Sequence, residues 1–155
     1  MLRRVRVVAF RAVGKMPRWM RRFLIHSLAP SFTVGAMCMI TRADGERLLV
    51  RHSYRHGWGV PGGLLKRGEE AADGARRECM EEVGLTIVLD HPPTVVVDAR
   101  ARRVDVIFTA RPADGVSTDV SACSAELLEA RWFPPDQLPA LQHETANALR
   151  LVTRS

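Results

Sequence analysis

Residues 63–85 read GLLKRGEEAADGARRECMEEVGL. The stretch begins in a glycine-rich loop and continues into an acidic segment, where Glu78, Glu81 and Glu82 are spaced i, i+3 and i+4. At 3.6 residues per turn, these carboxylates fall on one face of a helix. Like charges at that spacing repel each other, and a bound cation would offset the repulsion. Carboxylate oxygens with no His or Cys beside them favour Mg²⁺ or Mn²⁺ over zinc.

The same stretch resembles the Nudix box, in which a glycine, a glutamate, an Arg-Glu pair, a Glu-Glu pair and a final glycine stand at fixed distances. Every fixed position is matched, by Gly63, Glu69, Arg77, Glu78, Glu81, Glu82 and Gly84. Cys79 stands where the family more often has an aliphatic residue, and a buried cysteine behaves as a small hydrophobe. A salt-bridged surface helix is the simpler interpretation of the acids, but it explains neither the glycines nor the tandem glutamates.

The resemblance implies an α/β fold, a Nudix-type α/β/α sandwich around a central mixed β-sheet, covering roughly residues 32–152. We therefore expect a Nudix hydrolase domain over residues 31–155, preceded by a basic amphipathic helical extension over residues 1–30. Local patterns agree with an alternation of strands and helices. They predict strands at 32–41, 47–52, 86–90, 94–99, 104–110 and 131–133, and helices at 70–83, 135–138 and 144–152.

The resemblance also implies an activity, the metal-dependent hydrolysis of a diphosphate joined to another group, typically a nucleoside. The expected ligands of Mg²⁺ or Mn²⁺ are Glu78, Glu81 and Glu82, with a backbone carbonyl of Gly62 or Gly63. Among these, Glu82 is the strongest candidate. A catalytically silent, nucleotide-binding Nudix-like domain is the alternative function.

One carboxylate must also act as general base, and members of the family differ in which one serves. Glu78 is the candidate inside the box. Glu126 and Glu129, in the segment before the last predicted strand, are alternatives whose simpler interpretation is a solvated surface.

Other residues of the stretch are expected to support the site. Arg77 lies one helical turn from Asp73 and Glu81, where an ion pair would hold the metal-binding carboxylates in place. Glu69 stands at the helix entrance, is favoured by the helix dipole and would brace the loop. Gly84 is suited to end the helix in the left-handed conformation.

Substrate contacts are expected from the segment that precedes the glycine-rich loop. Its polar and aromatic side chains could reach phosphates or a base, and they are Arg51, His52, Tyr54, Arg55, His56 and Trp58. A tryptophan is more often part of the core, and Tyr54 is equally an ordinary loop residue. Relatives selective for ADP-ribose often carry a proline about fifteen residues after the box, where this chain has Ala99 and Arg100. Relatives that cleave dinucleoside polyphosphates often have a tyrosine there, and the additional motifs of NADH-cleaving relatives and of coenzyme A hydrolases are also absent. Together these absences favour a nucleoside triphosphate or a related nucleotide.

Composition fits a soluble globular protein, with 46% hydrophobic and 26% charged residues. Cys38, Cys79 and Cys123 stand among apolar or small residues without zinc-site spacing, which predicts buried, reduced thiols and a cytoplasmic location. The net charge of +6 is unevenly distributed. Residues 1–30 contribute +8 and contain no acidic residue, which leaves −2 for the remaining 125 residues. A nucleic-acid-binding face spread over the whole domain is therefore not expected.

The basic segment has helical periodicity in two parts, residues 2–16 and Arg18–Leu28, separated by Pro17. The second part predicts a short helix that buries its apolar residues, Trp19, Phe23, Leu24 and Leu28. Two interpretations remain open. The extension packs on the core or on the second subunit of a homodimer, or it lies on an anionic membrane or on RNA.

Overall fold

The computed structural model describes residues 16–28, 31–90 and 92–152. The chain divides into two compact units, Met1–Phe32 and Thr33–Ser155. In the first unit, helix α2 spans Arg18–Leu28 and has the predicted bounds. The prediction that its apolar residues are buried is wrong for Trp19, Phe23 and Leu28, which are exposed. The side chain of Leu24, the fourth predicted residue, lies outside the part that the structure describes. The helix predicted over residues 2–16 falls almost entirely outside the described residues.

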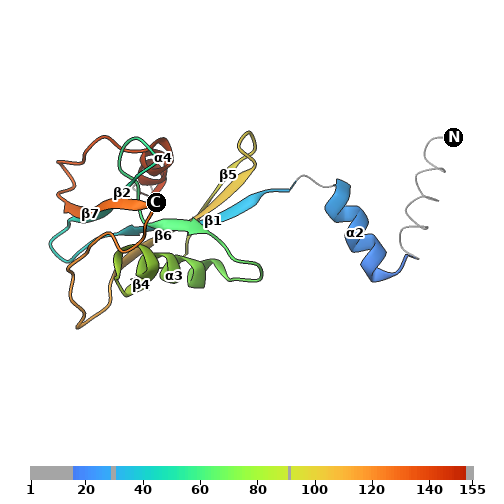
Figure 1. Ribbon diagram of the computed structural model, residues 1–155, viewed down its shortest axis with the longest axis horizontal. Helices are drawn as coiled ribbons and strands as arrows, with labels where there is room; N and C mark the ends of the chain where they lie inside the picture. Colours follow the sequence, from blue (N-terminus) through green and yellow to red (C-terminus); the bar gives the residue numbers. More distant parts are fainter. Residues whose placement is uncertain (1–15, 29–30, 91, 153–155) are drawn as a thin grey trace. The chain divides into compact units, whose positions relative to one another are not determined.

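The described part of the second unit is built around a five-stranded mixed sheet (Figure 1). Its strands are β1 (Thr33–Ile40), β3 (Gly62–Leu64), β4 (Ile87–Leu89), β5 (Thr94–Asp98) and β6 (Arg103–Pro112). The order is β3-β1-β6-β4, and β5 pairs with β6 beside β4. β1 and β6 are parallel, with Thr33 opposite Arg103 and Ile40 opposite Ala110, and the other pairings are antiparallel.

A separate two-stranded ribbon joins β2 (Arg47–His52) to β7 (Leu127–Phe133). The pairing is antiparallel, and its register shifts between Arg51 and His52. This irregularity comes at the end of β2, where the chain enters the loop that leads to β3. Strand irregularities of this kind redirect side chains and are frequent beside functional sites.

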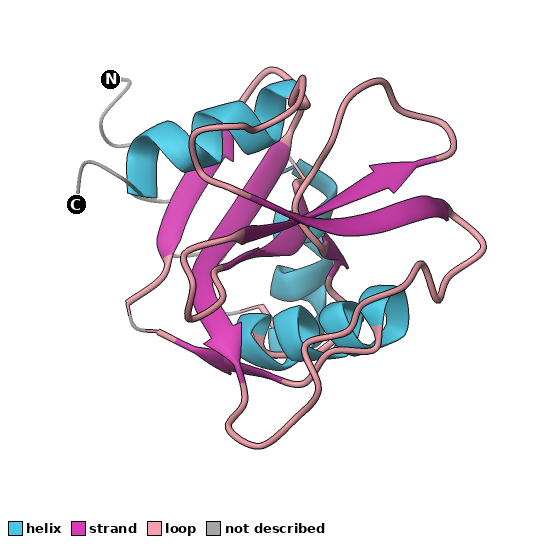
Figure 2. Cartoon of the chain, turned by 90° about the vertical axis from the view of Figure 1, so that its left-hand side faces the viewer, coloured by secondary structure: helices cyan, strands magenta, loops and turns pink. Residues whose placement is uncertain are grey.

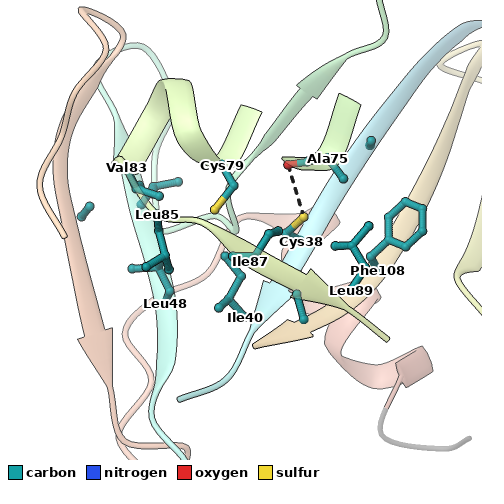
Figure 3. Close-up of a cluster of buried hydrophobic side chains, with 14 of the residues drawn as sticks. Cys38, Ile40, Leu48, Ala75, Cys79, Val83, Leu85, Ile87, Leu89 and Phe108 are labelled. Atoms are coloured by element: carbon teal, nitrogen blue, oxygen red, sulfur yellow. Dashed lines mark hydrogen bonds between the residues drawn. The ribbon is translucent and has the colours of Figure 1, made fainter. Parts of the chain in front are cut away.

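Two apolar clusters lie on opposite faces of the sheet, because successive side chains of β1 point in opposite directions. Cys38 and Ile40 pack in one cluster with residues of helix α3 (Ala71–Val83) and of β4, as Figure 3 shows. Met39 packs in the other cluster, with Ala148 and Leu149 of helix α4 (His143–Val152). Helices therefore cover both faces of the strands (Figure 2). The α/β sandwich predicted from the sequence is confirmed.

The acidic helix α3 has the boundaries that its sequence predicts to within one residue. Glu70 is the N-cap, in an extended conformation, and Ala71 begins the helix. Gly84 ends it with φ 70° and ψ 18°, and its N–H donates to the Met80 carbonyl. This left-handed ending matches the expectation for a glycine at that position.

Three features differ from the sequence predictions. β3 was not predicted, since three residues that include two glycines carry no strand pattern. β7 begins at Leu127, earlier than the predicted residue 131. Residues 135–138 form a turn instead of a helix, with the Gln137 N–H donating to the Pro134 carbonyl. A segment of four residues between prolines is too short to extend a helix.

The cysteines also differ from one another. Cys38 and Cys79 are buried, as predicted, but Cys123 is exposed. Burial, followed by the nearby Glu82 charge, raises the pKa of Cys38 to about 12. Burial also raises the pKa of Cys79.

We therefore expect a disulfide reagent such as Ellman's reagent to modify Cys123 alone in the folded protein, since only a thiolate reacts. All three thiols should react after unfolding in guanidinium. The variant Cys123→Ser provides the control and should show no fast reaction when folded. Rapid modification of that variant would show that one of the buried thiols is accessible.

Candidate active site

The glycine-rich loop lies unusually close to β1 and to helix α3. Gly62 and Gly63 pair with Met37 and Ala36 at the edge of the sheet. Gly62 has φ 154°, and a Cβ at this position would overlap the backbone of Ala36 and Met37. A Cβ on Gly63 would lie 2.5 Å from the carboxyl group of Glu78. The absence of side chains at these positions therefore lets the loop and the acidic helix meet.

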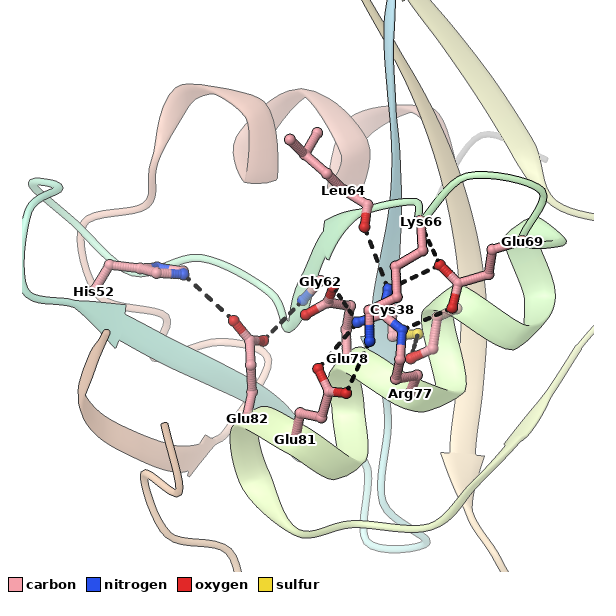
Figure 4. Close-up of polar contacts among 11 residues, drawn as sticks. Cys38, His52, Gly62, Leu64, Lys66, Glu69, Arg77, Glu78, Glu81 and Glu82 are labelled. Atoms are coloured by element: carbon pink, nitrogen blue, oxygen red, sulfur yellow. Dashed lines mark hydrogen bonds and ion pairs between the residues drawn. The ribbon is translucent and has the colours of Figure 1, made fainter. Parts of the chain in front are cut away.

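Glu82 is a buried carboxylate that points toward this loop, with a relative exposure of 7%. Its Oε2 accepts a hydrogen bond of 2.9 Å from the Gly62 backbone N–H. Its Oε1 lies 3.6 Å from Nε2 of His52, which is also buried (Figure 4). Contacts from the loop and from the end of β2 therefore fix the Glu82 carboxylate on both sides.

Arg77 links the other carboxylates of the helix (Figure 4). Its Nε and Nη2 donate to Glu69 at 2.7 and 2.9 Å. Its Nη1 donates to Glu78 at 2.6 Å and to Glu81 at 3.0 Å, and Nη2 also reaches the Leu64 carbonyl at 3.3 Å. These contacts, with Glu69 first, raise the pKa of Arg77. One guanidinium therefore serves as counterion to a group of carboxylates that would otherwise repel one another.

The predicted partners of Arg77 need one correction. Glu81 is a partner, but Asp73 pairs instead with Arg76, at 3.2 Å. Arg76 lies on the exposed side of the helix, next to Asp73, whereas Arg77 turns toward the loop.

Glu69 connects the loop to the helix. Besides Arg77, it accepts a hydrogen bond of 2.7 Å from the backbone N–H of Lys66. The hydrogen bonds from Arg77, followed by that from Lys66, lower the pKa of Glu69 to about 2, compared with an ordinary value of 4.5. The ionised form is therefore the one that the folded chain prefers.

This lowered pKa predicts a pH dependence of stability. Because the pKa is lower in the folded chain, the stabilisation from Glu69 is complete above about pH 4.5 and is lost as the pH falls toward 2. We expect Glu69→Gln to lower the urea midpoint of unfolding at neutral pH. Between pH 4.5 and 2, the midpoint of this variant should fall less steeply with decreasing pH than that of the wild type. Urea titrations of both proteins over this range, with Glu70→Gln as control, measure the effect. Parallel curves for wild type and Glu69→Gln would contradict the bracing role.

A cavity of about 450 Å³ opens beside these carboxylates. It is lined by Gly35, Met37, His52, Tyr54, Arg55, Gly62, Gly63, Leu64, Glu78, Glu82, Arg103, Asp105 and Glu126. Glu126 accepts a hydrogen bond of 3.1 Å from the Tyr54 hydroxyl. Burial, followed by this contact, raises the pKa of Tyr54.

Cationic side chains also line the cavity. Arg103 donates to Asp105 through Nε at 2.9 Å, and its Nη2 forms an ion pair with the same carboxylate at 2.8 Å. Arg103 and Arg55 both approach Glu144 in the first turn of α4, at 3.7 and 4.0 Å. The cavity therefore combines the carboxylates of α3 with guanidinium groups that can bind anions.

Five of the residues predicted for the site lie elsewhere, and one of them, His56, is an exposed residue of the loop after β2. Glu81 stands on the exposed side of Arg77 and also approaches Lys66. Trp58 packs edge to face on Phe133, with ring centroids 4.8 Å apart, in the cluster beneath α4. Arg51 lies over the Trp58 ring and pairs with Glu129 at 3.4 Å. The ribbon strands therefore hold Arg51 and Glu129 together, apart from the residues that line the cavity.

Arg103, Asp105 and Glu144 were not predicted as site residues. Arg103 stands just before the strand predicted at 104–110, but it begins β6. Arg103 and Asp105 are two residues apart in a strand, so their side chains share one face. Charged residues repeated with period two in an otherwise apolar strand are the signal that could have identified them.

A model of the NUDIX domain matches residues 31–154. The chain belongs to the NUDIX family. It is 33% identical over 99 residues to the human 8-oxo-dGDP phosphatase NUDT18, a match covering 61% of this chain and 30% of that protein. It is 30% identical over 128 residues to the NAD-capped RNA hydrolase NudC of Stutzerimonas stutzeri, covering 81% of this chain and 43% of the relative. The chain thus spans less than half the length of these curated relatives.

Solved NUDIX structures share the fold. The crystal structure of a NUDIX hydrolase from Nitrosomonas europaea superposes with a TM-score of 0.68 at 22% identity. The superposition covers 77% of this chain and 69% of that one. At this identity the likeness establishes the architecture of the NUDIX domain.

The donor atoms of this NUDIX site fit a hard divalent cation. Glu78, Glu81 and Glu82 offer oxygen ligands from one rigid helix, and Glu78 and Glu82 line the same cavity. Within residues 16–28, 31–90 and 92–152, no three His, Cys, Asp or Glu side chains already converge on one point. Glu78 and Glu81 instead contact Arg77. A cation would therefore have to draw these carboxylates away from the guanidinium.

The glycines of the NUDIX loop allow a matched pair of substitutions. We expect Gly63→Ala to displace the flexible Glu78 side chain, lowering turnover by about tenfold or more while unfolding free energy changes by less than about 1 kcal/mol. Gly62→Ala should instead destabilise the fold by about 1–3 kcal/mol, since its Cβ meets backbone. Nucleotide turnover and urea unfolding of both variants separate the effects. Unchanged turnover in Gly63→Ala would remove Glu78 from the site.

Proposed function

We propose that this NUDIX domain is a divalent-metal-dependent hydrolase that cleaves a diphosphate bond in a nucleoside triphosphate or a related nucleotide. One observation carries the proposal: Glu78 and Glu82 share a cavity with Arg55 and Arg103. A diphosphate is anionic, and water attacking phosphorus adds negative charge. A site for this reaction therefore needs groups that hold a cation next to groups that hold phosphate.

Glu78, Glu81 and Glu82 would hold Mg²⁺ or Mn²⁺, together with a backbone carbonyl of Gly62 or Gly63. When bound, the cation would neutralise phosphate charge and lower the pKa of the attacking water. The Gly62 N–H holds Glu82 in one orientation toward the loop. The helix keeps the spacing of the carboxylates fixed, which a loop would do less well.

Glu126 is our candidate for the general base among Glu78, Glu126 and Glu129. It lines the cavity, and the Tyr54 hydroxyl orients its carboxylate. Glu78 is engaged by Arg77 at 2.6 Å, and Glu129 pairs with arginines on the ribbon. In this role, Glu126 would take the proton of the water that attacks phosphorus.

Arg55 and Arg103 would bind the phosphate oxygens that the cation does not neutralise. Tyr54, which also lines the cavity and is 62% exposed, would stack on the base. A nucleotide substrate agrees with the names of the relatives, an 8-oxo-dGDP phosphatase and an NAD-capped RNA hydrolase. The free thiols of Cys38 and Cys79 support a cytoplasmic location.

A panel of nucleotides tests the proposal. It contains canonical and oxidised nucleoside triphosphates and diphosphates, ADP-ribose, nucleotide sugars, NAD and diadenosine polyphosphates. Phosphate and pyrophosphate release is measured with Mg²⁺, with Mn²⁺ and with a chelator, and Glu82→Gln serves as the blank. We expect turnover that requires the metal and is lost in the blank.

The same panel distinguishes the hydrolase from the alternative function, a catalytically silent domain that only binds nucleotides. Nucleotide binding by calorimetry without turnover in either metal would assign a catalytically silent, regulatory domain. Turnover that persists in the chelator would reject the metal-dependent mechanism. Arg55→Ala and Arg103→Ala, tested on the best substrate, should raise KM more than they lower kcat if they bind phosphate.

A further inference from the structure

Helix α2 separates apolar from basic side chains. Phe23 lies four residues after Trp19 and three after Met20, so these side chains share one face. Arg18, Arg21 and Arg22 are spaced i, i+3 and i+4 and share the opposite face.

The apolar face is exposed. Trp19 and Phe23, the two aromatic side chains of this face, each have a relative exposure of 70%. Transfer of a large aromatic side chain out of water is strongly favourable. Large apolar side chains that an ordered helix exposes to water indicate a surface that binds a partner.

The charge of the segment indicates the sign of the charge on that partner. Residues 1–30 carry +8 without an acidic residue, whereas the rest of the chain sums to −2. Within α2, the first turn contains no acid, and Arg18, Arg21 and Arg22 are exposed. The complementary partner is therefore strongly anionic and also offers an apolar phase.

We propose that α2 docks on an anionic phospholipid surface, with its axis in the plane of the interface. Trp19 and Phe23 enter the boundary between headgroups and acyl chains, and the arginines contact the headgroup phosphates. A basic polar face opposite Trp and Phe, at low overall hydrophobicity, is the composition of helices that lie on membranes. Among the described residues, no helix combines the length and apolar character needed to cross a bilayer.

The separation of the two faces favours lipid over other anionic or apolar partners. Sites for single-stranded nucleic acid place aromatic and basic side chains in one groove, because bases stack where the backbone is bound. In α2 the aromatic and basic side chains stand on opposite faces. A second copy of this helix would bring two segments of +8 together, and like charges oppose that contact.

The strength of docking should be moderate and dependent on salt. α2 has 11 residues, a length at which an isolated helix is marginal in water. Burial of its apolar face would stabilise the helix, and each arginine near an anionic surface would add about 1 kcal/mol, a factor of about five in binding. Raising the ionic strength screens that contribution.

The test uses the full chain and extruded vesicles of phosphatidylcholine alone or mixed equally with phosphatidylglycerol. We expect co-flotation with the mixed vesicles only, reduced by added NaCl, and a blue shift of tryptophan emission that Trp19→Phe abolishes. Arg21→Ala combined with Arg22→Ala should weaken binding about 30-fold, and Trp19→Ser combined with Phe23→Ser at least tenfold. Matched controls are Arg100→Ala and Val97→Ser, at exposed positions of the β5–β6 hairpin. These should bind like wild type.

Several results would overturn the proposal. Equal flotation with neutral and mixed vesicles would remove the role of charge, and undiminished binding by the aromatic double variant would remove the role of the apolar face. Binding to a short single-stranded RNA without vesicle binding would assign the segment to nucleic acid. A dimer that the aromatic substitutions dissociate, without vesicle binding, would assign the face to a second copy. Circular dichroism of each variant verifies that the domain remains folded.

Discussion

Replacement of Glu82 by glutamine is expected to lower metal-dependent nucleotide hydrolysis at least about a hundred-fold, while the protein stays folded. Glutamine keeps the size of the side chain and an oxygen that can accept the Gly62 N–H at its present position. It removes the negative charge on which a cation would depend. Loss of one charge from a repulsive group of glutamates offsets part of any cost, so unfolding free energy should change by less than about 1 kcal/mol.

The decisive measurement is turnover of the best nucleotide across a Mg²⁺ titration, beside urea unfolding without metal. Glu70→Gln is the matched control. It lies at the start of the same helix, is exposed and makes no side-chain capping hydrogen bond. Full turnover in Glu82→Gln would exclude Glu82 as a ligand. An equal loss of turnover in Glu82→Gln and Glu70→Gln would show that the effect comes from the changed charge of the helix in general and not from a lost metal ligand.

Arg77→Ala should damage stability and activity together. The substitution removes the counterion of Glu69, Glu78 and Glu81 and the hydrogen bond to the Leu64 carbonyl. Loss of charge-assisted contacts at a side chain that is 18% exposed should cost about 2–3 kcal/mol of unfolding free energy. Turnover should fall about 10- to 100-fold, because the carboxylates lose the group that orients them.

Two further variants separate geometry from charge. Arg77→Lys keeps the charge but lacks the planar fork that bridges Glu69 and Glu78, so it should recover only part of both properties. Arg76→Ala, one residue away, removes an exposed contact to Asp73 and should behave like wild type. Equal effects of the Arg76 and Arg77 substitutions would disprove the bracing role of Arg77.

The sequence predicted those parts of the fold that depend on local signals. The bounds of α3 followed from its acidic periodicity and from Gly84, and β2 was predicted residue for residue. β3 could not be predicted, because it exists only where Gly62 and Gly63 pair with β1. The exposure of Cys123 was likewise invisible, since its neighbours in sequence are small and apolar while its place is a surface loop.

The residues of the candidate site also fall into those that local sequence signals predict and those that depend on long-range pairing. Glu78 and Glu82 could be named from their spacing on one helix, a local property. Arg103 and Asp105 could not, because their place beside the cavity depends on the parallel pairing of β6 with β1. Trp58 was named among the candidate substrate contacts, although a core position is more usual for a tryptophan, and it packs in the core on a strand that is far away in sequence. The pairing of segments that are far apart in sequence thus decides which residues lie beside the cavity, and the spacing of residues along the chain does not determine this.

The parallel pairing of β1 with β6 has a consequence for the order of folding. Thr33 pairs with Arg103 and Ile40 with Ala110, contacts that close loops of about 70 residues. Helix α3 and the β5–β6 hairpin need only near neighbours and can form early. The cavity has walls from both β1 and β6, at Met37 and Asp105, and can form only after the chain has closed that loop. During synthesis, the cavity and any binding of the proposed nucleotide should therefore appear only after β6 has left the ribosome, later than the helix that carries the glutamates.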